Sequence, residues 1–247
     1  MAFTPYSRVA LVTGVGRAEG IGFEVCRQLA RQPMTVLLSA RTLEKAKPLA
    51  ALLQREGLDV RPYAVSVTST PSMQQLAGSI RRDFGQLDIL VNNAASPARR
   101  GEQVATANLS HAHSMMEATL YGSWQMCQVL LPLLRKSACG RIVNVSSGAG
   151  SHDDEAFGLH SDNQLGISYA IAKAALNALT SRLAHEESTD TLRINAVCPG
   201  FTASFAGGAE LGARPVADGA ASIVWAALID NDGPTGGFFR DGQRLPW

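Results

Sequence analysis

The sequence has little of what marks nucleic-acid-binding, membrane or secreted proteins. Its 247 residues carry a formal net charge of +1, and the lysines and arginines are scattered along the chain. We therefore expect no basic footprint for nucleic acid or for an anionic membrane surface. No apolar run approaches the roughly 20 residues needed to span a bilayer. Residues 1–13 lack a basic segment followed by a long apolar core, so we expect no secretory signal. These absences favour a soluble, cytoplasmic protein.

Cysteine is scarce, and the cysteines are not grouped. Four occur, without a Cys-x-x-Cys pair: Cys26, Cys127, Cys139 and Cys198. Free thiols are the expected state, and zinc has no cysteine cluster to use. His111 and His113 are two residues apart, which puts them on different faces of a helix. The sequence therefore predicts no metal site.

Repeats, low-complexity segments and the Gly-x-Ser-x-Gly motif of many hydrolases are also absent. Ser147 lies instead in the run Ser-Ser-Gly-Ala-Gly, which is not a nucleophile elbow. A serine-hydrolase function is therefore not favoured.

What the chain does contain is a regular alternation of short apolar runs with longer helical patterns. Buried strands are predicted at residues 8–13, 34–40, 60–67, 87–92, 140–146 and 192–197, with an edge strand at 236–240. Helices are predicted at 23–31, 42–56, 71–84, 104–135, 169–187 and 215–229. Such alternation predicts an α/β fold: a single domain over residues 1–247, with one doubly wound parallel sheet of about seven strands and helices on both faces. The inward residues expected in the 104–135 helix are Met115, Leu120, Trp124, Cys127, Leu131 and Leu134.

A glycine-rich loop follows the first predicted strand and leads directly into a helix. It reads Gly14-Val-Gly16-Arg17-Ala-Glu-Gly20-Ile21-Gly22. Glycine lets the backbone turn sharply and approach a pyrophosphate, and the helix N-terminus presents free N–H groups to it. Strand, glycine loop and helix together predict a dinucleotide site.

The end of the second predicted strand bears on which dinucleotide is bound. An acidic residue there would hydrogen-bond the ribose 2′-hydroxyl of NAD, whereas an arginine suits a 2′-phosphate. The sequence reads Ser39-Ala40-Arg41, without Asp or Glu, and Arg17 lies in the first loop. NADP(H) is therefore favoured over NAD(H).

Tyr169 and Lys173 are four residues apart in a helical pattern, so their side chains are expected on one face. A free phenol has a pKa near roughly 10. A neighbouring cation favours the phenolate and brings that pKa toward neutrality, which suits acid–base catalysis. The spacing alone is also that of an ordinary surface pair.

Five short motifs occur in a fixed order, each at the end of a predicted element. They are Thr13-Gly14 with Gly20-Ile21-Gly22, Asn92-Asn93-Ala94-Ala95, Ser147-Gly-Ala-Gly150, Tyr169 with Lys173, and Pro199-Gly200. In this order the chain resembles the short-chain dehydrogenase/reductase family, a Rossmann-type fold, over essentially its whole length. Residues 201–214 and the tail from Gly233 are most similar to carbonyl-reductase-type members.

The resemblance implies hydride transfer between the nicotinamide and a carbonyl carbon. Tyr169 would be the general acid/base, and Lys173 would lower its pKa and hold the nicotinamide ribose. Ser147 would polarise the carbonyl. Ser146 is the alternative to Ser147 for this role. Adjacent strand residues face opposite ways, so only one of the two side chains can reach the site.

The resemblance also implies a set of cofactor-binding residues. Beyond those of the glycine loop and Arg41, it comprises Ser66, Val67, Asn93, Ala94, Ala95, Tyr169, Lys173, Pro199, Gly200 and Thr202. Thr202 would contact the nicotinamide carboxamide, with Ser204 as the alternative.

Three positions depart from the family pattern. The glycine loop is two residues longer than usual, Ser66 replaces an aspartate that contacts the adenine, and Thr119 replaces an asparagine that links the lysine to solvent. Thr119 is accordingly a candidate catalytic position whose hydroxyl would preserve the helix distortion.

Two other functions stay open at this point. One is reduction of C=C by an enoyl reductase, whose tyrosine and lysine are usually spaced more widely. The other is a catalytically silent NADP-binding sensor. The substrate is expected between residues 95–103, 151–166 and 201–214, where Phe157, Leu159, Phe201 and Phe205 suggest a partly apolar compound. A homo-oligomer, dimer or tetramer, is the expected assembly.

Overall fold

The structure is a computed structural model that describes residues 8–161 and 165–247. Residues 1–7, and residues 162–164 of the predicted 151–166 substrate wall, lie outside this range. Eight strands form one sheet in the order β3-β2-β1-β4-β5-β6-β7-β8. They are β1 (Arg8–Val12), β2 (Met34–Ala40), β3 (Val60–Ala64), β4 (Ile89–Asn92), β5 (Gly140–Val145), β6 (Leu192–Val197), β7 (Phe238–Arg240) and β8 (Gln243–Arg244).

The sheet is parallel except at its last edge, as the alternating pattern predicted. All residues of β2, β4 and β5 are buried, because helices cover both faces. The strand order reverses between β1 and β4, which pair in register at Ala10 with Ile89 and Val12 with Val91. At such a switch point the crossovers leave a crevice beyond the carboxyl ends of the strands.

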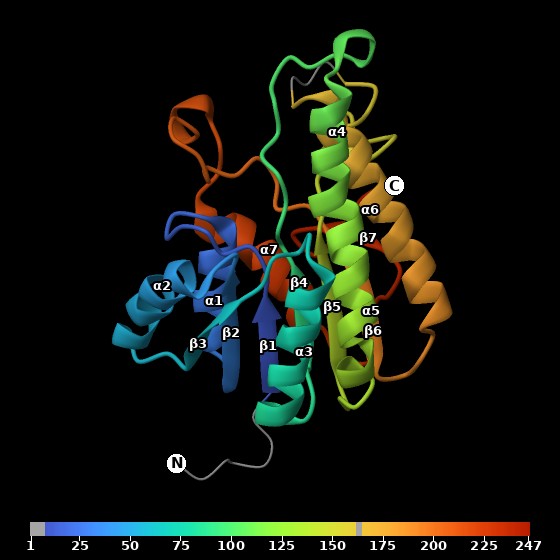
Figure 1. Cartoon of the computed structure of the whole chain (residues 1–247). Coiled ribbons are helices and arrows are strands. Elements are labelled where there is room, and N and C mark those ends of the chain that lie inside the picture. Colours follow the sequence, from blue (N-terminus) through green and yellow to red (C-terminus); the bar gives the residue numbers. More distant parts are fainter. Residues whose placement is uncertain (1–7, 162–164) are drawn as a thin grey trace.

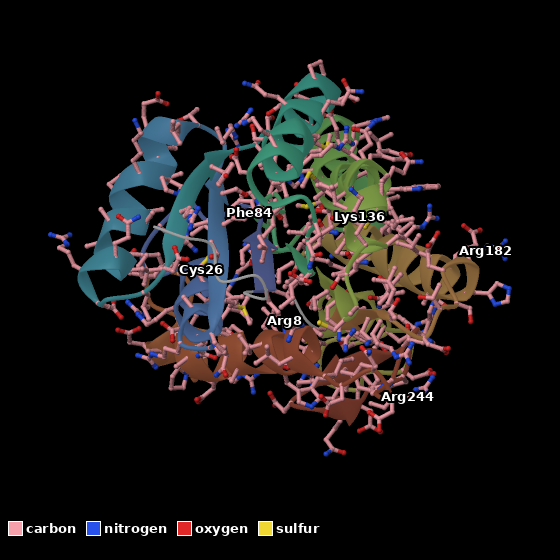
Figure 2. All side chains as sticks on the ribbon, turned by 90° about the horizontal axis from the view of Figure 1, so that it is seen from below. Arg8, Cys26, Phe84, Lys136, Arg182 and Arg244 are labelled. Atoms are coloured by element: carbon pink, nitrogen blue, oxygen red, sulfur yellow. The ribbon has the colours of Figure 1, made fainter. Side chains whose placement is uncertain are left out.

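Helices form a layer on each face of the sheet (Figures 1 and 2). Phe23, Leu53 and Ile223 belong to one buried cluster, which packs α1 (Ile21–Ala30), α2 (Leu43–Arg55) and α7 (Val216–Leu228) against one face. Met73 and Leu130 belong to the cluster on the other face. The second layer consists of α3 (Thr70–Phe84), α5 (Gly122–Leu134) and α6 (Ile167–Glu186).

The predicted helix over 104–135 is not continuous. It comprises the 3₁₀ turn η1 (Val104–Thr106), α4 (Leu109–Met116), a π-helical turn η2 (Glu117–Tyr121) and α5. The wide turn shifts the phase of the helix, so the prediction that Trp124 points inward is wrong: its side chain is 44% exposed, and Met126 is buried instead. The other five predicted inward residues are buried.

The prediction that residues 236–240 close the sheet is also wrong. β7 covers only Phe238–Arg240, and β8 pairs with it antiparallel through Phe239 and Arg244. Asp241 and Gly242 join the two strands with φ of 53° and 74°. This is the Asp-Gly hairpin turn, in which both central residues take positive φ, and it adds an eighth strand to the expected seven.

Tyr121 on η2, Trp124 on α5 and Ile171 on α6 are exposed large hydrophobic residues. The expected homo-oligomer stays a prediction. Within the described ranges no helix is long and apolar enough to cross a membrane.

Candidate active site

A cavity of about 810 Å³ lies beyond the carboxyl ends of the central strands. Its walls come from the glycine loop, the loop after β4, the ends of β5 and β6, the start of α6, and residues 201–205. Predicted site residues among those lining it are Gly14, Gly16, Arg17, Gly20, Ile21, Gly22, Asn93, Ala95, Ser147, Tyr169, Pro199, Gly200 and Thr202. The structure thus brings together residues spread over most of the sequence.

The loop after β4 holds the glycine loop in place. The hydroxyl of Thr13 accepts the backbone N–H groups of Asn93 and Ala94 at 3.0 and 3.1 Å, and the Asn93 amide donates to the Thr13 carbonyl at 2.8 Å. Gly14 has φ of 72°, and a Cβ there would lie 2.5 Å from the Cα of Ala94. A side chain at Gly14 would therefore force the two loops apart.

The cavity side of this loop suits a dinucleotide pyrophosphate. A Cβ at Gly16 would meet no atom within 4 Å, so the backbone is open to a close approach there. Gly20 is the N-cap of α1 and offers no side-chain acceptor to its first N–H groups. Since Gly20, Ile21 and Gly22 line the cavity, an anion can be held at this helix end.

Ser147 and Tyr169 meet at the opposite wall. Ser147 follows β5 and caps a 3₁₀ turn, its Oγ accepting the Ala149 N–H at 3.2 Å. Tyr169, in the first turn of α6, lines the same cavity, and the Ser147 side chain acts to lower the pKa of its phenol. Ser146, by contrast, is buried and donates to Oδ1 of Asn177 at 2.6 Å. Its hydroxyl is engaged in the core, whereas that of Ser147 is beside the phenol.

The protonation of Tyr169 is governed first by burial. Burial raises the pKa of Tyr169 to about 12, against the opposing effect of the hydrogen bond with Ser147. At neutral pH the phenol therefore carries its proton and can donate it. A cation is needed nearby if the phenolate is to form without a large cost.

Lys173 is the nearest candidate for that cation. Its Nζ lies 5.6 Å from the centroid of the Tyr169 ring and donates to the Val145 carbonyl at 2.6 Å. The side chain is buried behind the cavity wall, and burial lowers the pKa of Lys173 to about 8. The lysine is thus still mostly protonated at pH 7.

Thr119 lies in the π-helical turn η2, which packs on α6. It is fully buried, and its hydroxyl points to Sδ of Met115 at 3.7 Å. The helix distortion expected here is therefore present with threonine at this position. The hydroxyl itself is engaged with a neighbouring sulfur, a weak acceptor.

Several predicted site residues do not line the cavity: Arg41, Ser66, Val67, Ala94, Lys173 and Thr119. Arg41 is exposed directly after β2. Arg17 lines the cavity, and its guanidinium donates to the Ser204 carbonyl, which joins the glycine loop to the 201–214 segment. Thr202 and Ser204 both line the cavity, so the choice between them stays open.

Each of the three segments predicted to surround the substrate contributes residues to the cavity lining. Phe157, Phe201 and Phe205 line it, whereas Leu159 does not. Arg100, from the loop after β4, stacks on Phe205 with its guanidinium carbon 5.6 Å from the ring centroid. The substrate side of the cavity is thus largely apolar with one cationic edge.

Sequence reasoning missed Cys198, which lines the cavity. It was interpreted only as a free thiol, yet its Sγ accepts the N–H groups of Gly148 and Gly200 at 3.2 and 3.3 Å and a guanidinium N–H of Arg240 at 3.4 Å. Its position directly before Pro199-Gly200 was the available signal. No group of three or more metal-ligating side chains occurs among the residues that the structure describes.

The fold is a doubly wound parallel sheet with a glycine loop at its switch point. Together with Ser147, Tyr169 and the buried Lys173, this arrangement is typical of a nucleotide-dependent oxidoreductase. Comparison with known proteins gives the same class. The family described as short chain dehydrogenase matches residues 8–211, and the chain belongs to this family.

Relatives and solved structures agree with this assignment. The chain is 32% identical to (+)-neomenthol dehydrogenase of Arabidopsis thaliana over 96% of its length and 97% of the relative. It is 30% identical to carbonyl reductase [NADPH] 1 of Sus scrofa, covering 98% and 94%. Among solved structures, salutaridine reductase of Papaver somniferum superposes with a TM-score of 0.79 at 27% identity, covering 95% of this chain and 99% of that one. The chain is an oxidoreductase of the carbonyl-reductase type.

Proposed function

We propose that the protein transfers a hydride from NADPH to the carbonyl carbon of a ketone or aldehyde. The observation that carries the proposal is that Ser147 and Tyr169 line one cavity together with the glycine loop, with the Ser147 side chain acting to lower the pKa of the phenol. A carbonyl oxygen between these two hydroxyls receives two hydrogen bonds, which polarise it.

The coenzyme supplies the hydride when bound, and the protein supplies the proton. Tyr169, protonated at neutral pH, donates its hydroxyl proton to the oxygen of the developing alkoxide. Ser147 stabilises the same oxygen and then the phenolate. The positive charge of the buried Lys173 stabilises that phenolate. In the reverse direction the phenolate removes the proton of a secondary alcohol.

The preference for NADPH rests on charge at the end of β2. Arg41 is exposed there and no acidic residue stands beside it, while Arg17 occupies the glycine loop. A related carbonyl reductase carries NADPH in its name, and a short-chain dehydrogenase of Shigella flexneri 2a, 28% identical with a TM-score of 0.80, is described in complex with NADP. These relatives support the same coenzyme for this chain.

The apolar lining supports a hydrophobic carbonyl compound as substrate. Pro97, Phe157, Phe201 and Phe205 are among the residues that line the cavity. The names of two relatives, a neomenthol dehydrogenase and a carbonyl reductase, support a small-molecule substrate for this chain.

The decisive experiment follows deuteride from [4-²H]NADPH into a panel of ketones, diketones, aldehydes and enoyl thioesters, with wild type and Tyr169→Phe. We expect label at the carbinol carbon, and a fall in kcat of roughly 10²–10⁴-fold in the variant, because the general acid is removed. NADPH binding, measured by fluorescence, should be retained by the variant.

Three outcomes would contradict the proposal. Label found only at the carbon of a reduced C=C bond indicates an enoyl reductase. NADPH binding without turnover of any compound indicates a sensor. Activity of Tyr169→Phe within about threefold of wild type removes the acid–base role of Tyr169.

A further inference from the structure

Arg240 occupies an unusual place for a charged residue, at the last position of β7 beside the cavity. Its Nη2 donates to Oδ2 of Asp154 at 2.6 Å and to Sγ of Cys198 at 3.4 Å. The Asp154 side chain is 5% exposed and that of Arg240 23%. A partly buried ion pair of this kind is retained only where additional hydrogen bonds satisfy its carboxylate.

Asp154 uses its second oxygen to build the turn that carries Phe157. Oδ1 accepts the N–H groups of Ala156 and Phe157 at 3.1 and 3.0 Å. The guanidinium carbon of Arg240 lies 5.7 Å from the centroid of the Phe157 ring, over its face. Arg240 therefore contacts both the turn and the aromatic side chain that the turn presents to the cavity.

Cys198 connects the same guanidinium to the catalytic wall. Its Sγ accepts the N–H of Gly148, the residue after Ser147, and the N–H of Gly200, in the loop after β6. Gly148 is also pressed against the ion pair, because a Cβ there would lie 2.5 Å from Oδ2 of Asp154 and 2.8 Å from Nη2 of Arg240. A shift of the Arg240 guanidinium would therefore displace the backbone at Gly148, which follows Ser147.

The tail beyond Arg240 anchors the other end of the Asp154 turn. The hydroxyl of Ser151 donates to the Pro246 carbonyl at 2.9 Å and accepts the Asp154 N–H at 3.0 Å. The His152 N–H donates to the Trp247 carbonyl at 2.8 Å. The C-terminal strand pair and the residue 151–158 segment are therefore one connected unit.

We propose that Arg240 is a positioning residue for the reaction. It sets the Phe157 wall against the Ser147 turn and the Pro199-Gly200 loop, so that a bound carbonyl compound meets Ser147 and Tyr169 in a reactive geometry. The inference rests on the proposed carbonyl reduction for its kinetic consequences, but its structural consequence can be measured separately.

The test uses the full-length protein with Arg240→Met, Arg240→Lys and Asp154→Asn. Methionine removes the charge and keeps an unbranched side chain, whereas asparagine keeps an Oδ1 acceptor for the Ala156 and Phe157 N–H groups. Arg135→Met is the matched control, since Arg135 forms a two-bond ion pair with Glu187 at 2.9 and 2.5 Å. Glu187 follows α6 at the end opposite Tyr169, about 27 Å along the helix axis from it.

Hydrogen exchange of the amides is the first readout. In Arg240→Met we expect faster exchange in residues 147–158 and at Gly200, by at least about fivefold, with residues 8–40 unchanged. Arg135→Met should leave both regions as in wild type. Unchanged exchange in 147–158, or equal loosening by the control, overturns the inference.

Steady-state kinetics with a small and a bulky aromatic ketone, below the unfolding temperature of each variant, is the second readout. We expect kcat of Arg240→Met to fall roughly 10–100-fold, since misplacement of about 1 Å can cost that much, while NADPH affinity stays within about threefold. KM for the bulky ketone should rise more than KM for the small one, because only the bulky compound needs the Phe157 wall. Arg240→Lys should recover at least threefold in kcat, since its ammonium keeps the ion pair with Asp154.

A purely structural role would lower the unfolding temperature and leave kcat of the folded variant within about twofold of wild type, which overturns the inference. If Arg240→Met does not fold, Arg240→Lys and Asp154→Asn are judged by the same criteria. If wild type reduces no carbonyl compound, the proposed function fails, and the exchange pattern alone decides whether Arg240 holds the cavity wall.

Discussion

The protonation of Lys173 should control the basic limb of the pH profile of reduction. The ammonium is buried behind the cavity wall with the Val145 carbonyl as hydrogen-bond acceptor at 2.6 Å. Burial lowers its pKa to about 8, while burial raises that of Tyr169 to about 12. Between pH 7 and 10 the lysine is therefore the residue of this pair that loses its proton.

The size of the effect follows from these two values. With a pKa of about 8, the charged fraction of Lys173 falls from about 0.9 at pH 7 to about 0.1 at pH 9. If only the charged lysine stabilises the phenolate, kcat/KM for ketone reduction falls about tenfold over this interval. The decline then continues tenfold for each further pH unit until Tyr169 itself begins to titrate.

The assay is kcat/KM for one ketone between pH 6 and 10, since this parameter reports groups of the free enzyme. Lys173→Arg is the informative variant, because a guanidinium stays charged throughout this range. We expect lower absolute activity in the variant, but no fall in its kcat/KM near pH 8. A limb of unchanged position in Lys173→Arg, or a flat wild-type profile up to pH 10, would refute the reasoning.

Stability provides an independent check on the same pKa. Because the folded-state pKa lies below the usual 10.5 of lysine, the unfolded chain binds more protons between about pH 8 and pH 10.5. Stability from this group therefore rises with pH across that window, and the penalty at pH 7 is about 3 kcal/mol. Lys173→Met should remove this pH dependence, so its stability relative to wild type should be greatest near pH 7 and smallest above pH 10.5, as measured by urea unfolding.

Two further predictions concern the coenzyme site. Arg41→Ala should weaken NADPH binding by at least about tenfold more than NADH binding, because the lost guanidinium would contact only the 2′-phosphate; calorimetric titration giving equal losses for the two coenzymes would remove that role. Gly14→Ala should destabilise the fold by roughly 1–3 kcal/mol in denaturant unfolding, because it adds a clash with Ala94 to the cost of positive φ. Gly57→Ala is its control, with φ of 81° and open space at the Cβ, and an equal loss in both would show that crowding against Ala94 contributes nothing.

Most strands were predictable because they are short, largely apolar runs, whereas β8, which is Gln243–Arg244, is polar and was not predicted. β2 and β6 begin and end at the predicted residues. β3 ends at Ala64 instead of Val67, since its pairing with β2 stops where β2 stops at Ala40. The end of a strand is decided by its neighbour as well as by its own residues.

The 104–135 segment shows where periodicity fails. Its apolar pattern is compatible with one long helix and does not mark the wide turn at Glu117–Tyr121; only the family resemblance indicated a distortion at Thr119. Gly122 packs where a Cβ would lie 2.7 Å from the Val67 carbonyl, so contact with the loop after β3 constrains the turn. Trp124 was consequently placed on the wrong face.

The sequence by itself determined the sheet, its parallel order and the positions of Tyr169, Lys173 and Ser147, because each of these follows from local patterns at the ends of elements. Only the tertiary structure decided which serine meets the phenol and that burial, rather than the lysine, dominates the pKa of Tyr169. Only it showed that Cys198, Asp154 and Arg240 join three walls of the cavity. Those properties depend on contacts between residues up to 86 positions apart, as between Asp154 and Arg240. Distances and burial of that kind arise only when the sheet brings its loops to one edge.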